Sequence, residues 1–167
     1  MSDDFLQSLN HLAMGTRLKR AGVALQSEAQ KWLQANGCDI PSAHLPVITA
    51  LDRMGATSVG VLARMLGIAQ PGVSRMVEQL VAGGWVRSET DPKDRRIREI
   101  QLTDKGRTFA AEASRSLWPV VEKAVARVCA GLSGPFMSQL TTLENRLATD
   151  ALEASFRSAQ ADLEEQR

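Results

Sequence analysis

Residues 62–77 read LARMLGIAQPGVSRMV, and this stretch decides the fold. Gly67 predicts the end of a short helix that Thr57-Ser58 can cap at its start. Gln70-Pro71 predicts the start of a second helix that runs to Gly83-Gly84, because proline is tolerated in a first helical turn and glycine favours a helix end. The pattern therefore predicts two short helices joined by a glycine-containing turn.

The second helix of this pair has one apolar and one polar face. At about 3.6 residues per turn, its apolar stripe would pack on the first helix and consists of Val73, Met76, Val77 and Leu80. The opposite face collects Pro71, Ser74, Arg75, Glu78 and Gln79. Short polar side chains and one arginine near a helix start can reach base edges in the major groove, and the helix start itself favours a phosphate. An ordinary helical hairpin with a solvated face is the alternative interpretation.

A β-hairpin with a basic tip is predicted directly after the helix pair. Residues 85–87 and 97–102 each alternate apolar and polar side chains, as half-buried strands do. The turn between them holds Lys93, Arg95 and Arg96, and Asp94 can position one arginine by a charge-assisted hydrogen bond. An arginine on a thin turn suits the narrow minor groove, whose negative potential attracts guanidinium groups. A tip with charges placed for solubility is the alternative.

The charges of the chain are segregated along its length. The 167 residues carry 20 Lys+Arg and 19 Asp+Glu, a net charge of +1, which argues against a uniformly basic DNA-coating protein. Residues 64–107 hold nine basic and six acidic residues, whereas 144–167 hold three basic and six acidic ones. A nearly neutral total therefore does not exclude a DNA-binding face.

The helix pair and hairpin together resemble the winged helix-turn-helix of the MarR family of bacterial regulators. Besides residues 62–77, the resemblance is carried by Gly84-Trp85-Val86-Arg87, by the run DPKDRR at 91–96 and by LTDKG at 102–106. It implies a mainly α fold with one small β-hairpin wing, in which residues 36–107 form the DNA-binding domain. The terminal regions, 1–35 and 108–167, would be helical dimerisation regions.

The resemblance also implies which residues contact DNA. The helix from Gln70 would be the recognition helix, and its DNA-facing residues would be Gln70, Gly72, Ser74, Arg75 and Gln79. In the wing, Arg95 would enter the minor groove, supported by Asp94, with Arg96 near a phosphate or in the Asp94 pair. Gly72 departs from the family pattern and removes one base contact.

Long helices are expected on both sides of this domain. The apolar spacing predicts helices over residues 5–35, from Pro41-Ser42 to Gly55 with Ser42 as N-cap, from 103 to about 130 with a bend at Pro119, and over 135–157. A core of about 90 residues would leave the apolar side chains of the last helix exposed, and the family resemblance implies a homodimer joined through the terminal helices. The recognition helices of such a dimer would stand about 34 Å apart and read a pseudo-palindromic operator.

Control by a small ligand is a further implication of the resemblance, since many relatives respond to aromatic acids. A small aromatic or acidic effector would bind between the dimerisation helices and the winged domain, and the candidate residues are Arg17, Trp32, His44, Met54 and Trp118. The alternative is that these residues serve packing and surface roles.

Several other classes of function are disfavoured by the sequence. No stretch approaches 18 uninterrupted apolar residues, and the acidic start lacks the features of a signal peptide, so we expect a cytoplasmic protein without a membrane span. Neither a metal-ligand spacing, a glycine-rich phosphate loop nor a Ser-His-acid pattern is present, so neither an enzyme nor a metal or cofactor site is expected. Asp39 would raise the pKa of the Cys38 thiol, which disfavours redox sensing, and Cys129 is expected in the core.

The sequence thus predicts a homodimeric, sequence-specific regulator that binds double-stranded DNA and acts as a repressor released by a small ligand. The alternative is a winged-helix protein whose basic hairpin binds an acidic protein partner. The two differ in salt response, because binding through several phosphates weakens by orders of magnitude between 50 and 200 mM salt.

Overall fold

The computed structural model describes residues 5–90, 98–130 and 132–147. Its two compact units comprise residues 1–123 and 124–167 and are described separately. The elements, in chain order, are α1 (Phe5–Ser8), η1 (Asn10–Ala13), α2 (Met14–Ala35), η2 (Ser42–His44), α3 (Leu45–Met54), β1 (Thr57–Ser58), α4 (Val59–Leu66), α5 (Gln70–Ala82), β2 (Val86–Thr90), β3 (Arg98–Leu102), α6 (Asp104–Ser116), α7 (Trp118–Val128) and α8 (Phe136–Leu147). The predicted class, mainly α with a small β wing and terminal helices, is confirmed.

The wing belongs to a three-stranded antiparallel sheet of order β1-β3-β2 rather than to a hairpin alone. In the hairpin, Val86 pairs with Leu102 and Thr90 with Arg98. The third strand consists of two residues, with Thr57 opposite Ile100 and Ser58 opposite Glu99. Sequence patterning missed this strand because two residues are too few to show an alternation.

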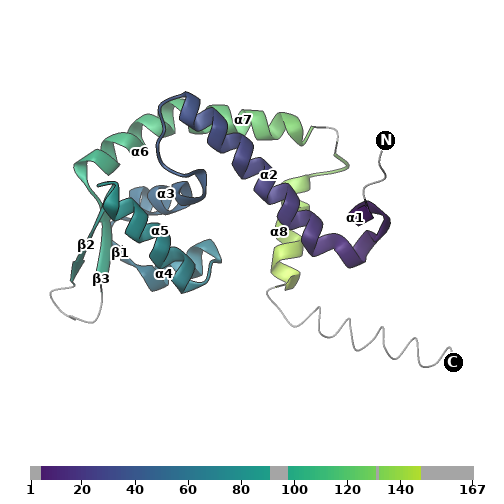
Figure 1. Cartoon of the computed structure of the whole chain (residues 1–167), viewed down its shortest axis with the longest axis horizontal. Helices are drawn as coiled ribbons and strands as arrows, with labels where there is room; N and C mark the ends of the chain where they lie inside the picture. Colours follow the sequence, from purple (N-terminus) through teal and green to yellow (C-terminus); the bar gives the residue numbers. More distant parts are fainter. Residues whose placement is uncertain (1–4, 91–97, 131, 148–167) are drawn as a thin grey trace, which may run out of the picture. The chain divides into compact units, whose positions relative to one another are not determined.

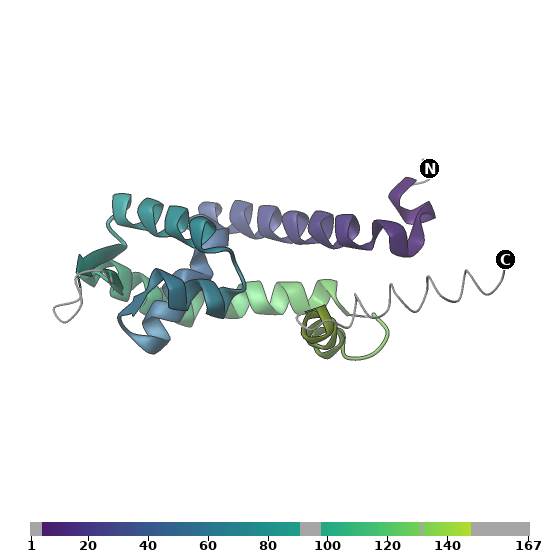
Figure 2. The same cartoon turned by 90° about the horizontal axis from the view of Figure 1, so that it is seen from below.

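The core of the first unit lies among α3, α4, α5 and the sheet, which lie near the C-terminal end of α2 in both views (Figures 1 and 2). Its largest fully buried side chains come from the α2–α3 segment, from α4 and α5, and from the two longer strands, and they include Leu33, Ile40, Ile48, Leu62, Leu80 and Ile100. Burying such branched side chains is the main favourable term in folding. This core fixes the orientation of α5.

The predicted helix over 5–35 is broken near its start. Asn10 has a φ of +46°, which is outside the helical region, so that α1 and η1 are separate turns ahead of α2. Asparagine tolerates this left-handed region better than most residues do. The long helix therefore begins at Met14, although Asn36-Gly37 ends it as predicted.

The helix predicted from Ser42 starts later than expected. Ser42 opens the 3-10 turn η2, and its side chain does not cap a helix but donates to the backbone oxygen of Gln26 at 3.1 Å. The α-helical part begins at Leu45 and has Pro46 in its first turn, where the missing N–H costs little. Gly55, with a φ of +78°, ends α3 as predicted.

The helix predicted over 103–130 is divided into α6 and α7. The division falls at Leu117, two residues before Pro119, which cannot donate a hydrogen bond to the preceding turn. Cys129 lies just past the end of α7 and is half-buried, so its predicted place in the core is wrong. In the second unit α8 follows Pro135, as predicted, and the described part of the chain ends at Leu147.

Candidate nucleic-acid interface

The turn between α4 and α5 is held by backbone geometry. Gly67 caps the end of α4 in the left-handed region, with a φ of +63°, and its N–H bonds back to Ala63 and Arg64. The N–H of Ile68 also donates to the Ala63 oxygen, at 3.1 Å. At the other end of α4, the Ser58 hydroxyl accepts from the N–H of Val61, as the predicted N-cap. The structure thus contains the predicted helix-turn-helix with both caps of its first helix satisfied.

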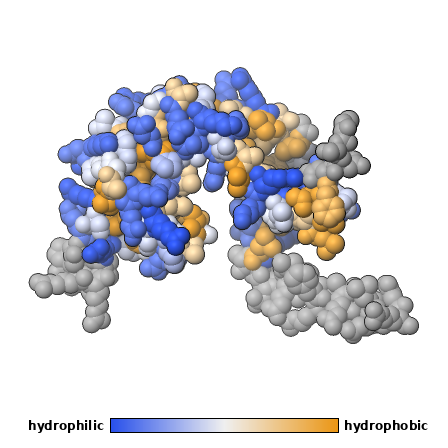
Figure 3. Space-filling model, viewed as in Figure 1, coloured by the Kyte–Doolittle hydropathy of each residue, from blue (hydrophilic) through white to orange (hydrophobic). Residues whose placement is uncertain are grey.

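The buried stripe of α5 determines which side chains face solvent. Val73, Val77 and Leu80 are at most 5% exposed. The opposite face therefore leaves Gln70, Arg75, Glu78 and Gln79 exposed, while Ser74 is half-buried. In the view of Figure 3 the surface over α5 is largely hydrophilic. A straight helix with polar and basic groups on its free face has the shape and chemistry to enter a major groove.

The start of α5 has donors that no side chain caps. Its N-cap, Ala69, offers no capping side chain, and the Ala69 oxygen accepts from the N–H groups of Gly72 and Val73. Pro71 in the first turn has no N–H. A helix start of this kind carries partial positive charge and attracts an anion such as a phosphate.

Gly72 has a packing role that the sequence did not reveal. A Cβ at this position would stand 3.1 Å from Cγ2 of Ile68 in the preceding turn, which is closer than an ordinary contact. The residue therefore lies against the turn, and its lack of a side chain leaves room for the Ile68 side chain. The contact runs between residues four apart across the turn, so no helical periodicity could have indicated it.

Three polar side chains form a cluster on the outer face of the wing strands. The Nε of Arg87 is 2.9 Å from Oε1 of Glu89, and the side-chain amide of Gln101 donates to Oε2 of the same carboxylate at 2.8 Å. Arg87 and Gln101 are opposite each other in the strand register. Sequence reasoning missed this cluster. The signal available was the alternation of side chains in β2, which places Arg87 and Glu89 on the same face of the strand.

Asp94, Arg95 and Arg96, the wing residues expected to contact or support contact with DNA, lie outside the described residues. What the structure describes is the base of the wing, from Val86 to Thr90 and from Arg98 to Leu102. Their expected roles stay predictions.

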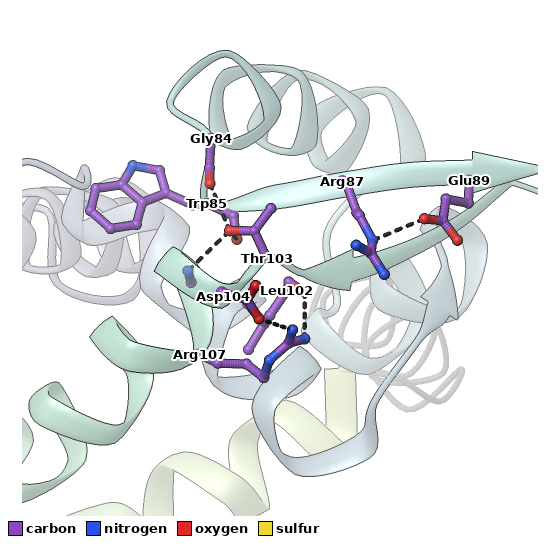
Figure 4. A network of polar contacts seen from close by, with 9 residues as sticks. Gly84, Trp85, Arg87, Glu89, Leu102, Thr103, Asp104 and Arg107 are labelled. Carbon is purple, nitrogen blue, oxygen red and sulfur yellow. Dashed lines mark hydrogen bonds and ion pairs between the residues drawn. The ribbon is translucent and has the colours of Figure 1, made fainter.

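The wing is joined to α5 and α6 by contacts around Trp85 (Figure 4). The Thr103 hydroxyl donates to the oxygen of Gly84 at 2.7 Å and accepts from the N–H of Gly106 at 3.1 Å, so it caps α6 and holds the chain before β2. The ammonium of Lys105 lies 3.7 Å from the centre of the Trp85 ring and donates to the Gly83 oxygen at 2.8 Å. These contacts link the end of the proposed recognition helix rigidly to both strands.

The residues expected to bind an effector are dispersed within one protomer. Arg17 lines a groove on η1 and α2 together with His11, Met14 and Leu18. Trp32 is fifteen residues further along the same helix, about 22 Å away, so one small ligand cannot contact both. Trp32 and Trp118 pack against the core, and Met54 is exposed at the end of α3. His44 is buried, and burial lowers its pKa.

Cys38 is buried and its thiol points to the Ile40 oxygen, with sulfur and oxygen 3.7 Å apart. Burial, and to a smaller extent the charge of Asp39, raises the pKa of this thiol, which agrees with the expectation from the Gly-Cys-Asp sequence. Among the described residues, no group of three or more His, Cys, Asp or Glu could hold a metal ion. No helix in the same ranges is long and apolar enough to cross a membrane.

Comparison with known proteins gives one family match and several similar solved structures. Residues 39–97 match the model of the MarR family. A MarR family transcriptional regulator from Silicibacter pomeroyi DSS is 24% identical, with a TM-score of 0.58, over 81% of this chain and 87% of that one. A mutant MarR from E. coli, complexed with operator DNA, is 18% identical with a TM-score of 0.65, over 87% and 97% of the two chains.

A third similar structure concerns a ligand. BpsR from Bordetella bronchiseptica, whose DNA binding is regulated by 6-hydroxynicotinic acid, is 24% identical with a TM-score of 0.63, over 81% of this chain and 98% of that one. At these identities the solved structures establish the fold, and the sequence match covers the segment from the loop before α3 into the wing.

Proposed function

The winged domain of this chain is that of the MarR family of transcriptional regulators, and from this premise we propose that the protein binds double-stranded DNA sequence-specifically as a homodimer. The observation that carries the proposal is the free face of α5. Its buried stripe directs Gln70, Arg75 and Gln79 to solvent, and its uncapped start can hold a phosphate. The protein acts by binding and not by catalysis.

In this proposal each protomer contacts DNA through two elements. Gln70, Ser74, Arg75 and Gln79 of α5 approach base edges in the major groove, with the backbone at Gly72 close to the DNA. Arg95 enters the adjacent minor groove with Asp94 as its support, and Arg96 lies near a phosphate. The rigid contacts of Thr103 and Lys105 at the wing base favour simultaneous insertion of helix and wing, because they fix the angle between the two.

The homodimer is proposed from exposed apolar side chains on the helices outside the winged domain. They include Phe5, Leu12, Val128 and Met137, each more than 60% exposed. Large exposed apolar residues on each of these helices favour their being covered by another chain. A twofold dimer would present two recognition helices to the half-sites of a pseudo-palindrome.

We further propose that the protein is a cytoplasmic repressor released by a small aromatic or acidic effector. The regulation of BpsR by 6-hydroxynicotinic acid, a heteroaromatic acid, supports this class of ligand. Because Arg17 and Trp32 are too far apart for one ligand, Trp32, His44 and Trp118 are the better candidates within a protomer. Thermal unfolding of the chain with a panel of aromatic acids tests this, since a ligand that binds the folded state raises the melting temperature.

Selection of bound DNA from a random pool tests the main proposal directly. A sequence-specific dimer is expected to enrich two related half-sites in inverted orientation, with centres about 34 Å, or about 10 base pairs, apart. Recovery of unrelated sequences would contradict sequence-specific binding.

Arg75→Ala is the first variant to measure against the selected site, by fluorescence anisotropy at several salt concentrations. If Arg75 contacts a base, the substitution is expected to weaken the free energy of DNA binding by about 1–3 kcal/mol. If Arg75 contacts a phosphate, the slope of log affinity against log salt concentration is expected to fall by about one. Arg95→Ala is expected to weaken binding while leaving the dimer intact. Lys31→Ala is the matched control, because Lys31 is an exposed cation on α2 that pairs with Glu28. An Arg75→Ala protein with unchanged affinity and salt dependence would remove α5 from the interface.

A further inference from the structure

The joint between α2 and α3 is a second feature of the fold that carries an inference. The backbone N–H of Ser42 donates to the side-chain oxygen of Gln30, and the Ser42 hydroxyl donates to the Gln26 oxygen at 3.1 Å. These two hydrogen bonds dock η2 onto the C-terminal half of α2. Since α3 follows η2 without a break, the same contacts hold the winged domain to the helix that precedes it.

His44 is the last residue of η2 and is buried, with 8% of its surface exposed. Its Nδ1 has no hydrogen-bond partner among the described residues. A neutral imidazole has one N–H donor and one bare acceptor nitrogen, and a buried unpaired acceptor costs less than a buried unpaired donor. The geometry therefore fits a neutral ring whose Nδ1 carries no proton.

The charged groups on the elements around His44 do not compensate a proton on the ring. Glu28 and Lys31 of α2 are exposed and pair with each other at 2.6 Å. Asp39 in the loop before η2, and Asp52 and Arg53 in the last turn of α3, are exposed. Burial is the cause that lowers the pKa of His44, without a contribution from any of these charges. A proton at Nδ1 would thus meet neither an acceptor nor a counter-charge.

We propose that His44 makes the joint proton-sensitive: protonation of its buried ring breaks the two Ser42 hydrogen bonds and loosens η2 from α2, while the packing of Leu33 in the core remains. The ring gains water contacts when the joint opens, so the open form binds the proton more tightly than the closed one. By linkage, the closed joint is fully favoured above the ordinary histidine pKa of about 6.5 and is lost as the pH falls through and below that value.

The consequence for DNA binding rests on the function proposed above. In a dimer the joint sets the position of each recognition helix relative to the dimerisation helices, so a loosened joint no longer fixes the distance between the two helices. Operator affinity is therefore expected to fall on acidification. If each protomer takes up one proton, operator affinity falls by at most about tenfold per pH unit for each proton taken up.

The test compares operator affinity between pH 8 and pH 5.5 for the wild type, His44→Gln and His11→Gln. His11 is the matched control, because it is the only other histidine of the chain and is exposed. The wild type and His11→Gln are expected to lose affinity in parallel as the pH falls, whereas His44→Gln keeps a flatter profile. Superimposable profiles for the wild type and His44→Gln would overturn the proposal. His44→Phe, an apolar ring in the same site, provides a second non-titrating variant where His44→Gln folds poorly.

A second readout needs no DNA and separates this inference from the proposed function. In the free protein, NMR is expected to show that His44 titrates below the ordinary histidine pKa of about 6.5, and that the amide of Ser42 exchanges faster with solvent in step with the His44 titration. Protonation of His44 without faster exchange at Ser42 would overturn the proton-sensitive joint. A protein that opens at Ser42 on acidification but binds no DNA at any pH would contradict the proposed function and leave the joint intact as a finding.

Discussion

Gly106 lies in the first turn of α6, where the helix passes directly under the backbone of Trp85. A Cβ at this position would stand 2.1 Å from the Trp85 carbonyl oxygen, and the neighbouring backbone leaves no flexible side chain to move aside. We expect Gly106→Ala to lower the free energy of unfolding by about 3 kcal/mol, because α6 must separate from the wing base to make room. Urea denaturation followed by circular dichroism measures this loss.

Gly60→Ala is the control for that substitution. Gly60 lies in the first turn of α4, and the nearest atom to an added Cβ is the Ser58 hydroxyl oxygen at 3.9 Å, an ordinary contact. Alanine is expected to be neutral or to stabilise the protein by up to about 1 kcal/mol, because it favours the helix. Equal losses for the two variants would show that the contact with Trp85 is not the cause.

The two cysteines are expected to differ in reactivity. Cys38 is buried and its pKa is raised, so little thiolate forms at neutral pH, whereas Cys129 is half-buried. In the folded protein, a chromogenic disulfide reagent should modify Cys129 first and Cys38 only on the timescale of unfolding. Rapid modification of Cys38 in the folded protein would contradict its burial.

At the scale of elements, Thr103 links the wing to α6. Its hydroxyl caps the helix by accepting from Gly106 and also donates to Gly84. Thr103→Val keeps the branched shape but removes both hydrogen bonds, and we expect a loss of about 2 kcal/mol in the free energy of unfolding. Thermal and urea denaturation check this value.

Thr141→Val is the matched control for Thr103→Val. The Thr141 hydroxyl donates to the Met137 oxygen four residues earlier in α8, and the residue is exposed. Its replacement is expected to change the free energy of unfolding by no more than about 0.5 kcal/mol. A comparable loss in both variants would mean that the hydroxyl of Thr103 has no special role at the wing base.

The sequence predicted those elements whose signals are local. Gly67, Pro71 and the stripe Val73–Val77–Leu80 lie within one helix pair, and the structure confirms the helices that they indicate. The break at Asn10 was not predicted, because asparagine in a helical pattern gives no sign of a left-handed backbone. The strand at Thr57 was not predicted either, since its partner Ile100 is remote in sequence and the strand has only two residues.

In the candidate site, too, the sequence predicted the features that depend on local signals and missed those that depend on contacts between separate segments. Helical periodicity correctly identified Arg75, Glu78 and Gln79 as exposed. The packing of Gly72 on Ile68 and the Arg87–Glu89–Gln101 cluster depend on how separate segments meet, which single-sequence patterning does not reveal. The length of α2 keeps Arg17 and Trp32 apart within one chain, a spacing that the sequence pattern did not take into account, and the effector residues stay a prediction.

At the scale of the whole molecule, the terminal helices are expected to hold the dimer. Truncation after Ser133 removes α8 with its exposed side chains Met137 and Leu147, which a second chain would cover. We expect the truncated protein to sediment as a monomer in analytical ultracentrifugation at micromolar concentration, and the full chain as a dimer. Circular dichroism checks that residues 5–123, which form a compact unit of their own, stay folded. A truncated protein that still dimerises would assign the interface to the remaining helices.

The pairing of Thr57 with Ile100 has a consequence for how this domain can be reused in other proteins. Ser58 caps the first helix of the helix-turn-helix and also belongs to a strand whose partner, among the described residues, is β3, which follows α5 and β2 in the chain. A fragment that contains only the two helices would keep the Ser58 cap but lose the strand partner and the core residue Ile100. The helix-turn-helix segment alone is therefore not expected to keep its structure outside this domain. A chimaera that grafts it onto another scaffold must carry the chain at least from Thr57 to Gly106.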